Sequence, residues 1–197
     1  MKPGARILLC AALAVALNAQ AGVTPQALSE AAIARTQHVV RYDGSYRSIA
    51  YPNGDVPAGT GVCTDVVIRS YRALGIDLQQ QVHEDMRAHF SRYPSKRLWG
   101  LTRTDTNIDH RRVPNLQVFF SRHGQVLPRS RDAADYAPGD IVTWMLPGNL
   151  PHIGIVTDQI DPASGTPKVV HNIGAGPRLD TVLFAWPVTG HYRYMPK

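Results

Sequence analysis

The stretch Gly61-Val62-Cys63-Thr64-Asp65, continued by Val66-Val67-Ile68-Arg69-Ser70-Tyr71, joins a glycine-bearing loop to the start of a helix. Apolar residues after the cysteine recur with helical spacing, so one face of this helix is expected to be buried. Cys63 is therefore expected near a helix N-terminus, where unpaired backbone N–H groups and the helix dipole favour a thiolate over a thiol. The expected buried face comprises Val66, Val67, Ile68, Tyr71 and Leu74, with Gly75 as the left-handed cap.

The N-terminal segment has the features of an export signal. A short basic start precedes an apolar run, Ile7 to Leu17, that is too short to span a bilayer. Ala19-Gln20-Ala21 then matches the small-x-small pattern of a cleavage site. We expect residues 1–21 to be a removed signal peptide and the protein to be periplasmic or secreted. An uncleaved anchor is the alternative, and a lipoprotein fits less well because Leu9 before Cys10 is not small.

Removal of the signal would change the cysteine count. The chain has two cysteines, and Cys10 would leave with the signal. Cys63 would then stand without an internal partner in a compartment that favours disulfides. It is therefore a free reactive thiol, an intermolecular link, or a buried inert cysteine.

Size and charge limit the partners. Residues 22–197 fit one domain with a sizeable core. The formal net charge of +6 falls to +4 when Lys2 and Arg6 are removed, which is a modest bias towards anionic partners. No basic run with interleaved aromatic residues indicates nucleic-acid binding, and no membrane span is expected in the mature chain.

The expected elements place helices first and strands last. This order predicts an α+β domain in which helices, including the one that bears Cys63, pack on a C-terminal antiparallel sheet. The polar segment between Ser91 and Arg112 is expected to be a functional surface loop. Helices are expected from Thr24 to about Val40, Cys63 to Leu74, Ile76 to Phe90 and Val113 to Phe120; strands are expected at Asp140 to Leu146, Ile153 to Asp158, Lys168 to His171, Val182 to Trp186 and Tyr192 to Tyr194.

A cysteine nucleophile needs an imidazole base, and that base needs a second group to orient it. His152 begins one predicted strand and His171 closes the next. In an antiparallel pair, His171 or Asn172 can lie beside His152 and hold its ring in one tautomer. The alternative is that both are structural histidines, hydrogen-bonded at strand ends.

A zinc site was compared with this arrangement. Four histidines, His110, His152, His171 and His191, with Asp109 or Asp140, could in principle gather a metal ion. The sequence contains no H-E-x-x-H spacing, no paired-cysteine motif and no i, i+4 histidine pair. We therefore expect no metal and no cofactor.

The order of these motifs resembles that of NlpC-type cysteine peptidases, which are papain-like bacterial cell-wall hydrolases. The motifs are helix-borne Cys63, Pro138 to Val142, His152 to Val156, and Val169 to His171. A closer similarity, from about Val39 to Tyr194, is to an exported family known only as a domain of unknown function. Its segments are Asn53 to Pro57, Gly61 to Asp65, Asn107 to Arg111 and His171 to Gly174.

The wider resemblance implies a papain-like fold and cleavage of an amide bond in peptidoglycan stem peptides. It implies that Cys63 is the nucleophile, His152 the general base and His171 the orienting residue. It also implies a tyrosine near the oxyanion hole, for which Tyr51 stands twelve positions before Cys63. Asn172 is the alternative orienting residue.

The substrate pocket matches the peptidases less well. The peptidases commonly have Asp-Cys-Ser-Gly where this chain has Val62-Cys63-Thr64-Asp65, so the acidic residue lies on the other side of the nucleophile. Asp65, His110 and Arg111 are the candidate substrate-binding residues, the last two as partners of a stem-peptide carboxylate. A solvated charge cluster is the alternative for His110 and Arg111.

Two other functions remain open at this point. One keeps the thiol chemistry but changes the acceptor, giving an acyltransferase or an amidase on another envelope substrate. The other is an envelope-binding module without catalysis. The sequence fixes neither the bond that is cleaved nor the oligomeric state.

Overall fold

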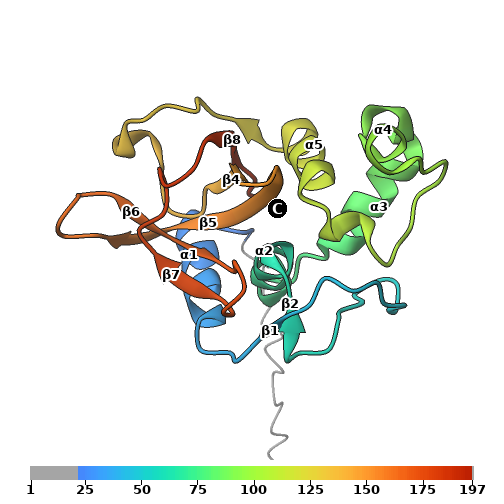
Figure 1. Cartoon of the computed structure of the whole chain (residues 1–197), viewed down its shortest axis with the longest axis horizontal. Helices are drawn as coiled ribbons and strands as arrows, with labels where there is room; N and C mark the ends of the chain where they lie inside the picture. The colour runs from blue at the N-terminus through green and yellow to red at the C-terminus, as the bar shows by residue number, and fades with distance from the viewer. Residues whose placement is uncertain (1–21, 197) are drawn as a thin grey trace, which may run out of the picture.

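A computed structural model describes residues 22–196. The predicted signal peptide, residues 1–21, lies outside the described residues. The fold is mixed α+β, with an antiparallel sheet and several helices, as the order of the motifs predicted. In Figure 1, α2 lies at the centre, between the sheet and the helices α3 and α4.

The helices begin and end close to the predicted positions. Thr24 caps α1 by accepting the N–H of Ala27 at 3.1 Å. This helix ends at Arg35 rather than near Val40. The next residue, Thr36, donates its hydroxyl to the carbonyl of Ile33 at 2.8 Å. The α-helices are α1 Pro25–Arg35, α2 Cys63–Ala73, α3 Leu78–His89, α4 Ser95–Trp99 and α5 Val113–His123, and the 3₁₀ turns are η1 Phe90–Arg92, η2 Asp109–Arg111 and η3 Ala133–Asp135.

Six strands form one antiparallel sheet in the order β3-β8-β4-β5-β6-β7. The strand predicted from Val182 to Trp186 is wrong. Leu183 is buried beneath the sheet and its carbonyl accepts the indole N–H of Trp144 at 2.9 Å, so this segment packs as a turn. The strands are β3 Gln125–Val126, β4 Ile141–Leu146, β5 Leu150–Ile160, β6 Pro167–His171, β7 Arg178–Asp180 and β8 Val188–Arg193.

A separate two-stranded parallel pair holds the loop before Cys63. It joins β1, Arg41–Tyr42, to β2, Thr60–Gly61. Tyr42 is the register partner of Gly61, two residues before Cys63. The segment between the two strands therefore loops out and returns, which brings Tyr42 close to the start of α2.

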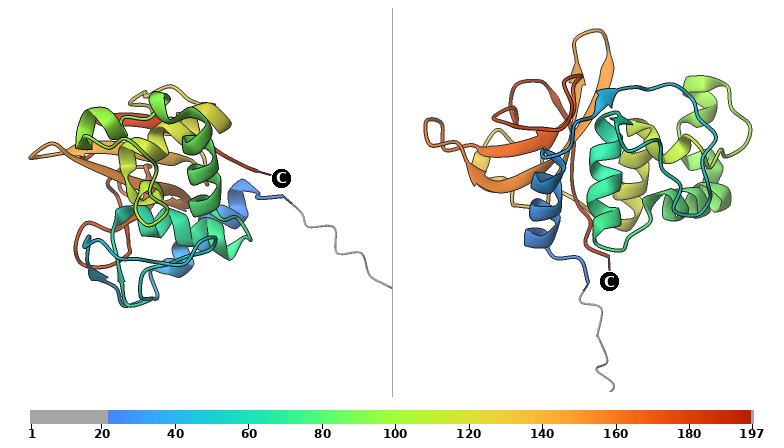
Figure 2. Two further views of the ribbon diagram at one scale, coloured as in Figure 1. Left: turned by 90° about the vertical axis from the view of Figure 1, so that its right-hand side faces the viewer. Right: turned by 90° about the horizontal axis from the view of Figure 1, so that it is seen from below.

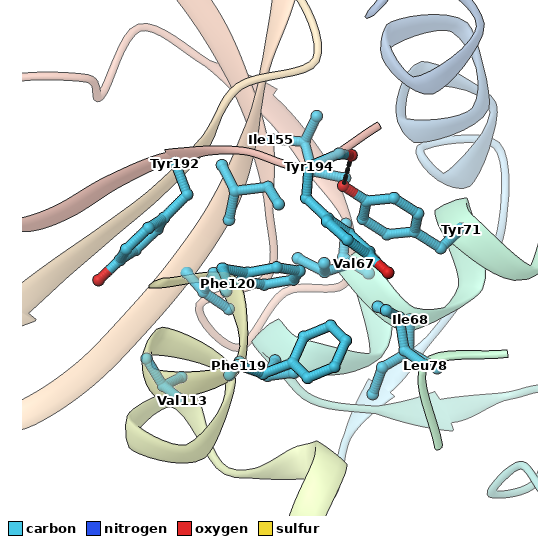
Figure 3. Close-up of a cluster of buried hydrophobic side chains, with 14 of the residues drawn as sticks. Val67, Ile68, Tyr71, Leu78, Val113, Phe119, Phe120, Ile155, Tyr192 and Tyr194 are labelled. Carbon is cyan, nitrogen blue, oxygen red and sulfur yellow. Dashed lines mark hydrogen bonds between the residues drawn. The ribbon is translucent and has the colours of Figure 1, made fainter. Parts of the chain in front are cut away.

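The larger hydrophobic core fills the space between the helices and one face of the sheet (Figure 3). Helix α2 is buried from Cys63 to Tyr71, including the polar residues Arg69 and Ser70, which lie outside the predicted buried face. Ser70 donates to the carbonyl of Val66 at 2.7 Å, and Arg69 binds the Asp55 carboxylate at 2.9 and 3.1 Å. The opposite face of the sheet carries a smaller cluster of Tyr136, Val142, Trp144, Val156, Val169 and Leu183.

The two ends of the described chain lie together. The N–H of Val23 donates to the carbonyl of Pro196 at 3.1 Å. The Tyr71 hydroxyl, near the C-terminal end of α2, donates to the carbonyl of Tyr194 at 2.7 Å (Figure 3). Figure 2 shows α1 and α2 running side by side, with the C-terminus beside them. None of the helices between residues 22 and 196 combines the length and apolar character needed to cross a membrane.

Candidate active site

Cys63 is the first residue of α2, as the sequence predicted. The backbone N–H groups of Ile153, Thr64 and Cys63 itself lie close enough to its sulfur to act towards a lower pKa of the thiol. Burial, and then the neighbouring Cys63 thiol, raise the pKa of the Tyr42 hydroxyl to about 12, so Tyr42 lies beside Cys63. The thiol is thus surrounded by donors from the helix start, from β5 and from β1.

A cavity of about 460 Å³ opens above Cys63. Its walls come from the loop before α2, from α4, from the start of α5 and from the hairpin between β4 and β5. Trp99 and Leu98 are partly exposed there, and the guanidinium of Arg112 lies 4.3 Å from the centre of the Trp99 ring. The lining includes Tyr42, Cys63, Trp99, Arg111, Arg112 and Pro151.

The ionisation of the thiol differs from the prediction. Burial raises the pKa of Cys63 to about 12, and the Asp65 carboxylate adds to the increase. The backbone N–H groups at the helix start act in the opposite direction, as expected for a helix N-terminus, but the loss of hydration outweighs them. The expected thiolate is therefore a neutral thiol in this structure.

His152 and His171 form the predicted histidine pair. Nε2 of His152 lies 2.9 Å from Nδ1 of His171. The Asp180 carboxylate lies 3.3 Å from Nε2 of His171, although the direction is too oblique for a hydrogen bond. This carboxylate favours the proton on Nε2 of His171, so Nδ1 accepts and Nε2 of His152 donates. Nδ1 of His152 is then the free acceptor, which is the nitrogen that a general base needs.

Two tryptophans enclose the histidine pair. The ring centre of His152 lies 5.7 Å from that of Trp144 and 6.0 Å from that of Trp186. Burial lowers the pKa of His152 to about 3, and the neighbouring His171 contributes in the same direction. Burial also lowers the pKa of His171, against the opposing effect of Asp180. Both imidazoles are therefore neutral at physiological pH.

The thiol and the imidazole approach β5 from different sides. Cys63 packs in the larger core with Ile153, whereas the preceding residue, His152, is the register partner of Trp144 and packs on its ring. Successive residues of a strand point to opposite faces, which accounts for this separation. Among residues 22–196, no hydrogen bond joins Cys63 to His152. The predicted base, His152, is thus the chain neighbour of Ile153, the residue that packs with Cys63. The two predicted catalytic side chains are not in contact.

Tyr51 does not lie at the nucleophile. Its ring packs edge-on against His83 of α3, with ring centres 5.0 Å apart, and it is not part of the cavity lining. The tyrosine beside Cys63 is Tyr42, which the sequence analysis did not select. The prediction used the number of residues between Tyr51 and Cys63. The β1–β2 pair brings residue 42 next to residue 61, so the segment from 43 to 59, which contains Tyr51, loops away from Cys63.

Asp65 and Arg111 do not form a substrate-binding pair of free charges. Two nitrogens of the Arg111 guanidinium each lie 2.9 Å from an Asp65 oxygen, and both side chains are almost fully buried. Asp65 also accepts the N–H of Val62 at 2.6 Å, which fixes the residue before the nucleophile. The role of this ion pair is to hold the Cys63 loop.

His110 and Asn172 are also structural in this arrangement. His110 is buried away from the cavity, and burial lowers its pKa to about 3, so a cationic contact to substrate is excluded. Asn172 is buried and its amide lies 3.5 Å from the carbonyl of Gly61, which links the end of β6 to β2. His171, not Asn172, contacts His152.

No group of three or more histidine, cysteine, aspartate or glutamate side chains is arranged to hold a metal ion within residues 22–196.

Sequence comparison places the chain in a family. Residues 29–194 match the family described as Domain of unknown function (DUF1287), and the chain belongs to that family. A relative, the uncharacterized protein YijF of Escherichia coli strain K12, is 50% identical over 174 residues, covering 88% of this chain and 83% of YijF.

Proposed function

We propose that this protein is an exported cysteine hydrolase of papain-like type that cleaves an amide bond in peptidoglycan stem peptides. One observation carries the proposal. Cys63 lines a cavity of about 460 Å³ and packs in the core with Ile153, the residue that follows His152 of the histidine pair. The candidate nucleophile thus lies beside residue 153 of β5, and the candidate base with its orienting group lies at residue 152; acyl transfer requires that these groups meet.

The reaction follows from the hydrogen bonds of the histidine pair. The Cys63 sulfur attacks the amide carbon while Nδ1 of His152 accepts the thiol proton. The C–N bond then breaks, the proton passes to the leaving amine, and a thioester remains on Cys63. Water attacks this thioester with His152 again accepting a proton, which releases the acid and restores the thiol. His171 holds the reactive tautomer throughout.

The developing oxyanion needs donors that are already in place. The backbone N–H of Cys63 belongs to the first turn of α2, and Tyr42 lies beside the sulfur. Tyr42 therefore takes the role that Tyr51 was predicted to have. The exposed Trp99 and the Arg112 guanidinium on the cavity wall would both contact the substrate. The Trp99 ring would pack on the substrate, and Arg112 would bind a carboxylate of the substrate.

Catalysis requires one local movement. The Cys63 thiol and the His152 ring must come within hydrogen-bond distance before the proton can pass between them. Hydrogen bonds between catalytic groups are often long without substrate and tighten when it binds. A substrate that fills the cavity would also replace part of the water around the thiol.

The test is digestion of purified peptidoglycan sacculi by the mature protein, followed by mass analysis of the released muropeptides. We expect wild type to release fragments cut at one amide bond, and Cys63→Ala to release none. His38→Ala changes an exposed histidine and serves as the matched control. A fragment carrying an added amine in the presence of a free amino compound would identify an acyltransferase. Equal digests from wild type and Cys63→Ala would overturn the proposal.

The ionisation of Cys63 favours a second candidate, an envelope-binding module that does not cleave. A buried thiol with a pKa of about 12 and no contact to His152 is unreactive as it stands. In that case wild type and Cys63→Ala would sediment with sacculi equally well, and neither would release muropeptides. The digestion experiment separates the two candidates directly.

A further inference from the structure

A second cavity of the described chain is larger than the one above Cys63. It has a volume of about 1280 Å³ and lies against η1, α4 and α5. We call it the basic groove. Four of its lining side chains are cationic and none is a carboxylate: Arg92, Lys96, Arg97 and Arg122.

Most of this positive charge is free. The Arg122 guanidinium is held by Asp85, with nitrogen–oxygen distances of 2.7 and 2.9 Å. Arg92, Lys96 and Arg97 are exposed and form no ion pair with any residue between 22 and 196. Surface cations without partners in a concave site attract anions, because the walls limit screening by water.

The basic groove adjoins the cavity above Cys63. One short helix, α4, supplies Lys96 and Arg97 to the groove and its next two residues, Leu98 and Trp99, to the Cys63 cavity. Pro114, near the start of α5, lines both. A single bound chain can therefore contact both sites by crossing α4.

We propose that the basic groove binds the carboxylate-bearing part of an extended peptide whose scissile amide lies at Cys63. This inference rests on the proposed function for the identity of the scissile bond. Guanidinium and ammonium groups bind carboxylates through short, charge-assisted hydrogen bonds. The five residues of α4 span about 7 Å, which is two to three residues of extended peptide. The substrate is thus expected to carry a carboxylate at least two or three residues from the bond that is cut.

The experiment measures binding without turnover, in the Cys63→Ala protein. The ligand is a purified disaccharide with its stem pentapeptide, and the matched ligand is the same molecule with its carboxylates converted to amides. The variant is Lys96→Glu with Arg97→Glu. The control is Arg87→Glu with Arg131→Glu, which makes the same change of charge at exposed positions outside the groove.

Titration calorimetry should show that the groove variant binds the free-acid peptide about tenfold more weakly than the control variant, since two attractive charges become repulsive. The amidated peptide should bind weakly to every protein. The inference is overturned when the amidated and free-acid peptides bind with the same affinity, or when the groove and control variants do not differ. Peptide binding with no cleavage by wild type would instead refute only the hydrolase.

Discussion

The Arg111 guanidinium holds both oxygens of the Asp65 carboxylate at 2.9 Å, inside the protein and next to the loop that precedes Cys63. The same carboxylate accepts the N–H of Val62. Because Val62 precedes Cys63, the position of the sulfur depends on this buried ion pair. The pair also connects η2 with the first turn of α2.

Removing one partner of this ion pair should destabilise the fold. We expect Arg111→Ala to lower the free energy of unfolding by about 3–5 kcal/mol, because it leaves a buried carboxylate without a counter-charge. Urea denaturation measures this change. Arg41→Ala is the comparison, since the Arg41 side chain is 71% exposed in its pair with Asp43 and should contribute less than about 1 kcal/mol. Similar losses in the two variants would contradict the structural role of Arg111.

The thiol of Cys63 should behave as a weak acid. Burial raises its pKa to about 12, so the rate of alkylation by iodoacetamide should keep rising from pH 7 to beyond pH 10. A cysteine in a thiolate–imidazolium pair would instead react at a rate that is nearly constant above neutral pH. A plateau in that range would show that the thiol and His152 are paired in solution.

Tyr42 and Tyr51 should differ in their effect on the reaction. Tyr42→Phe removes a hydroxyl that lies beside the Cys63 sulfur, and we expect cleavage of sacculi to fall by about 10²-fold, as for loss of one oxyanion donor. Tyr51→Phe, on the His83 side of the molecule, should leave the rate unchanged. The rate of muropeptide release measures both. Equal rates for the two variants would remove Tyr42 from the site.

Buried histidines should make the fold sensitive to acid. The folded-state pKa values of His110 and His152 are about 3, below the value of about 6.5 that histidines have in the unfolded chain. Their stabilising effect is complete above pH 6.5 and is lost as the pH falls towards 3, by about 1.4 kcal/mol per pH unit for each histidine. Asp109, whose pKa burial raises to about 6, opposes this trend between pH 6 and 4.

The check is a series of urea denaturations between pH 7 and 4. In His110→Leu the fall in stability should be shallower by the contribution of one histidine. A variant with the same slope as wild type would show that His110 titrates normally in the folded protein.

His171 should matter more than Asp180. His171→Ala leaves Nε2 of His152 without its partner, and a buried unsatisfied donor costs about 1–3 kcal/mol. Asp180→Asn should have a smaller effect, because its side chain is 31% exposed and makes only an oblique contact. Urea denaturation and sacculus digestion should both rank the variants in this order. The reverse order would place Asp180 as the main orienting group.

Local patterns in the sequence were enough to predict the helix of Cys63 and the strands of the two histidines. Helical spacing after Cys63 and the caps at Thr24 and Gly75 depend only on neighbouring residues, and α2 begins at the predicted residue. The contact between His152 and His171 also followed from pairing adjacent strands, although the register places Gly154, not His152, opposite His171.

Features that depend on distant segments were missed. The parallel pair that brings Tyr42 to Cys63 consists of two-residue strands, too short to leave a periodic pattern. The Asp65–Arg111 pair joins residues 46 positions apart, and nothing in the sequence separates two buried partners from two surface charges. The thiol's pKa was predicted with the wrong sign because the helix N-terminus is local, whereas burial depends on the whole fold.

The hydrogen bond between Val23 and Pro196 determines where a fusion partner or surface linkage would lie relative to Cys63. Tyr194 is bound by Tyr71, eight residues along α2 from Cys63, which is about 12 Å of helix. Both ends of the described chain therefore emerge at the end of α2 that is remote from the nucleophile. A fusion partner or surface linkage at either end would therefore be attached away from Cys63 and would leave the first turn of α2 uncovered.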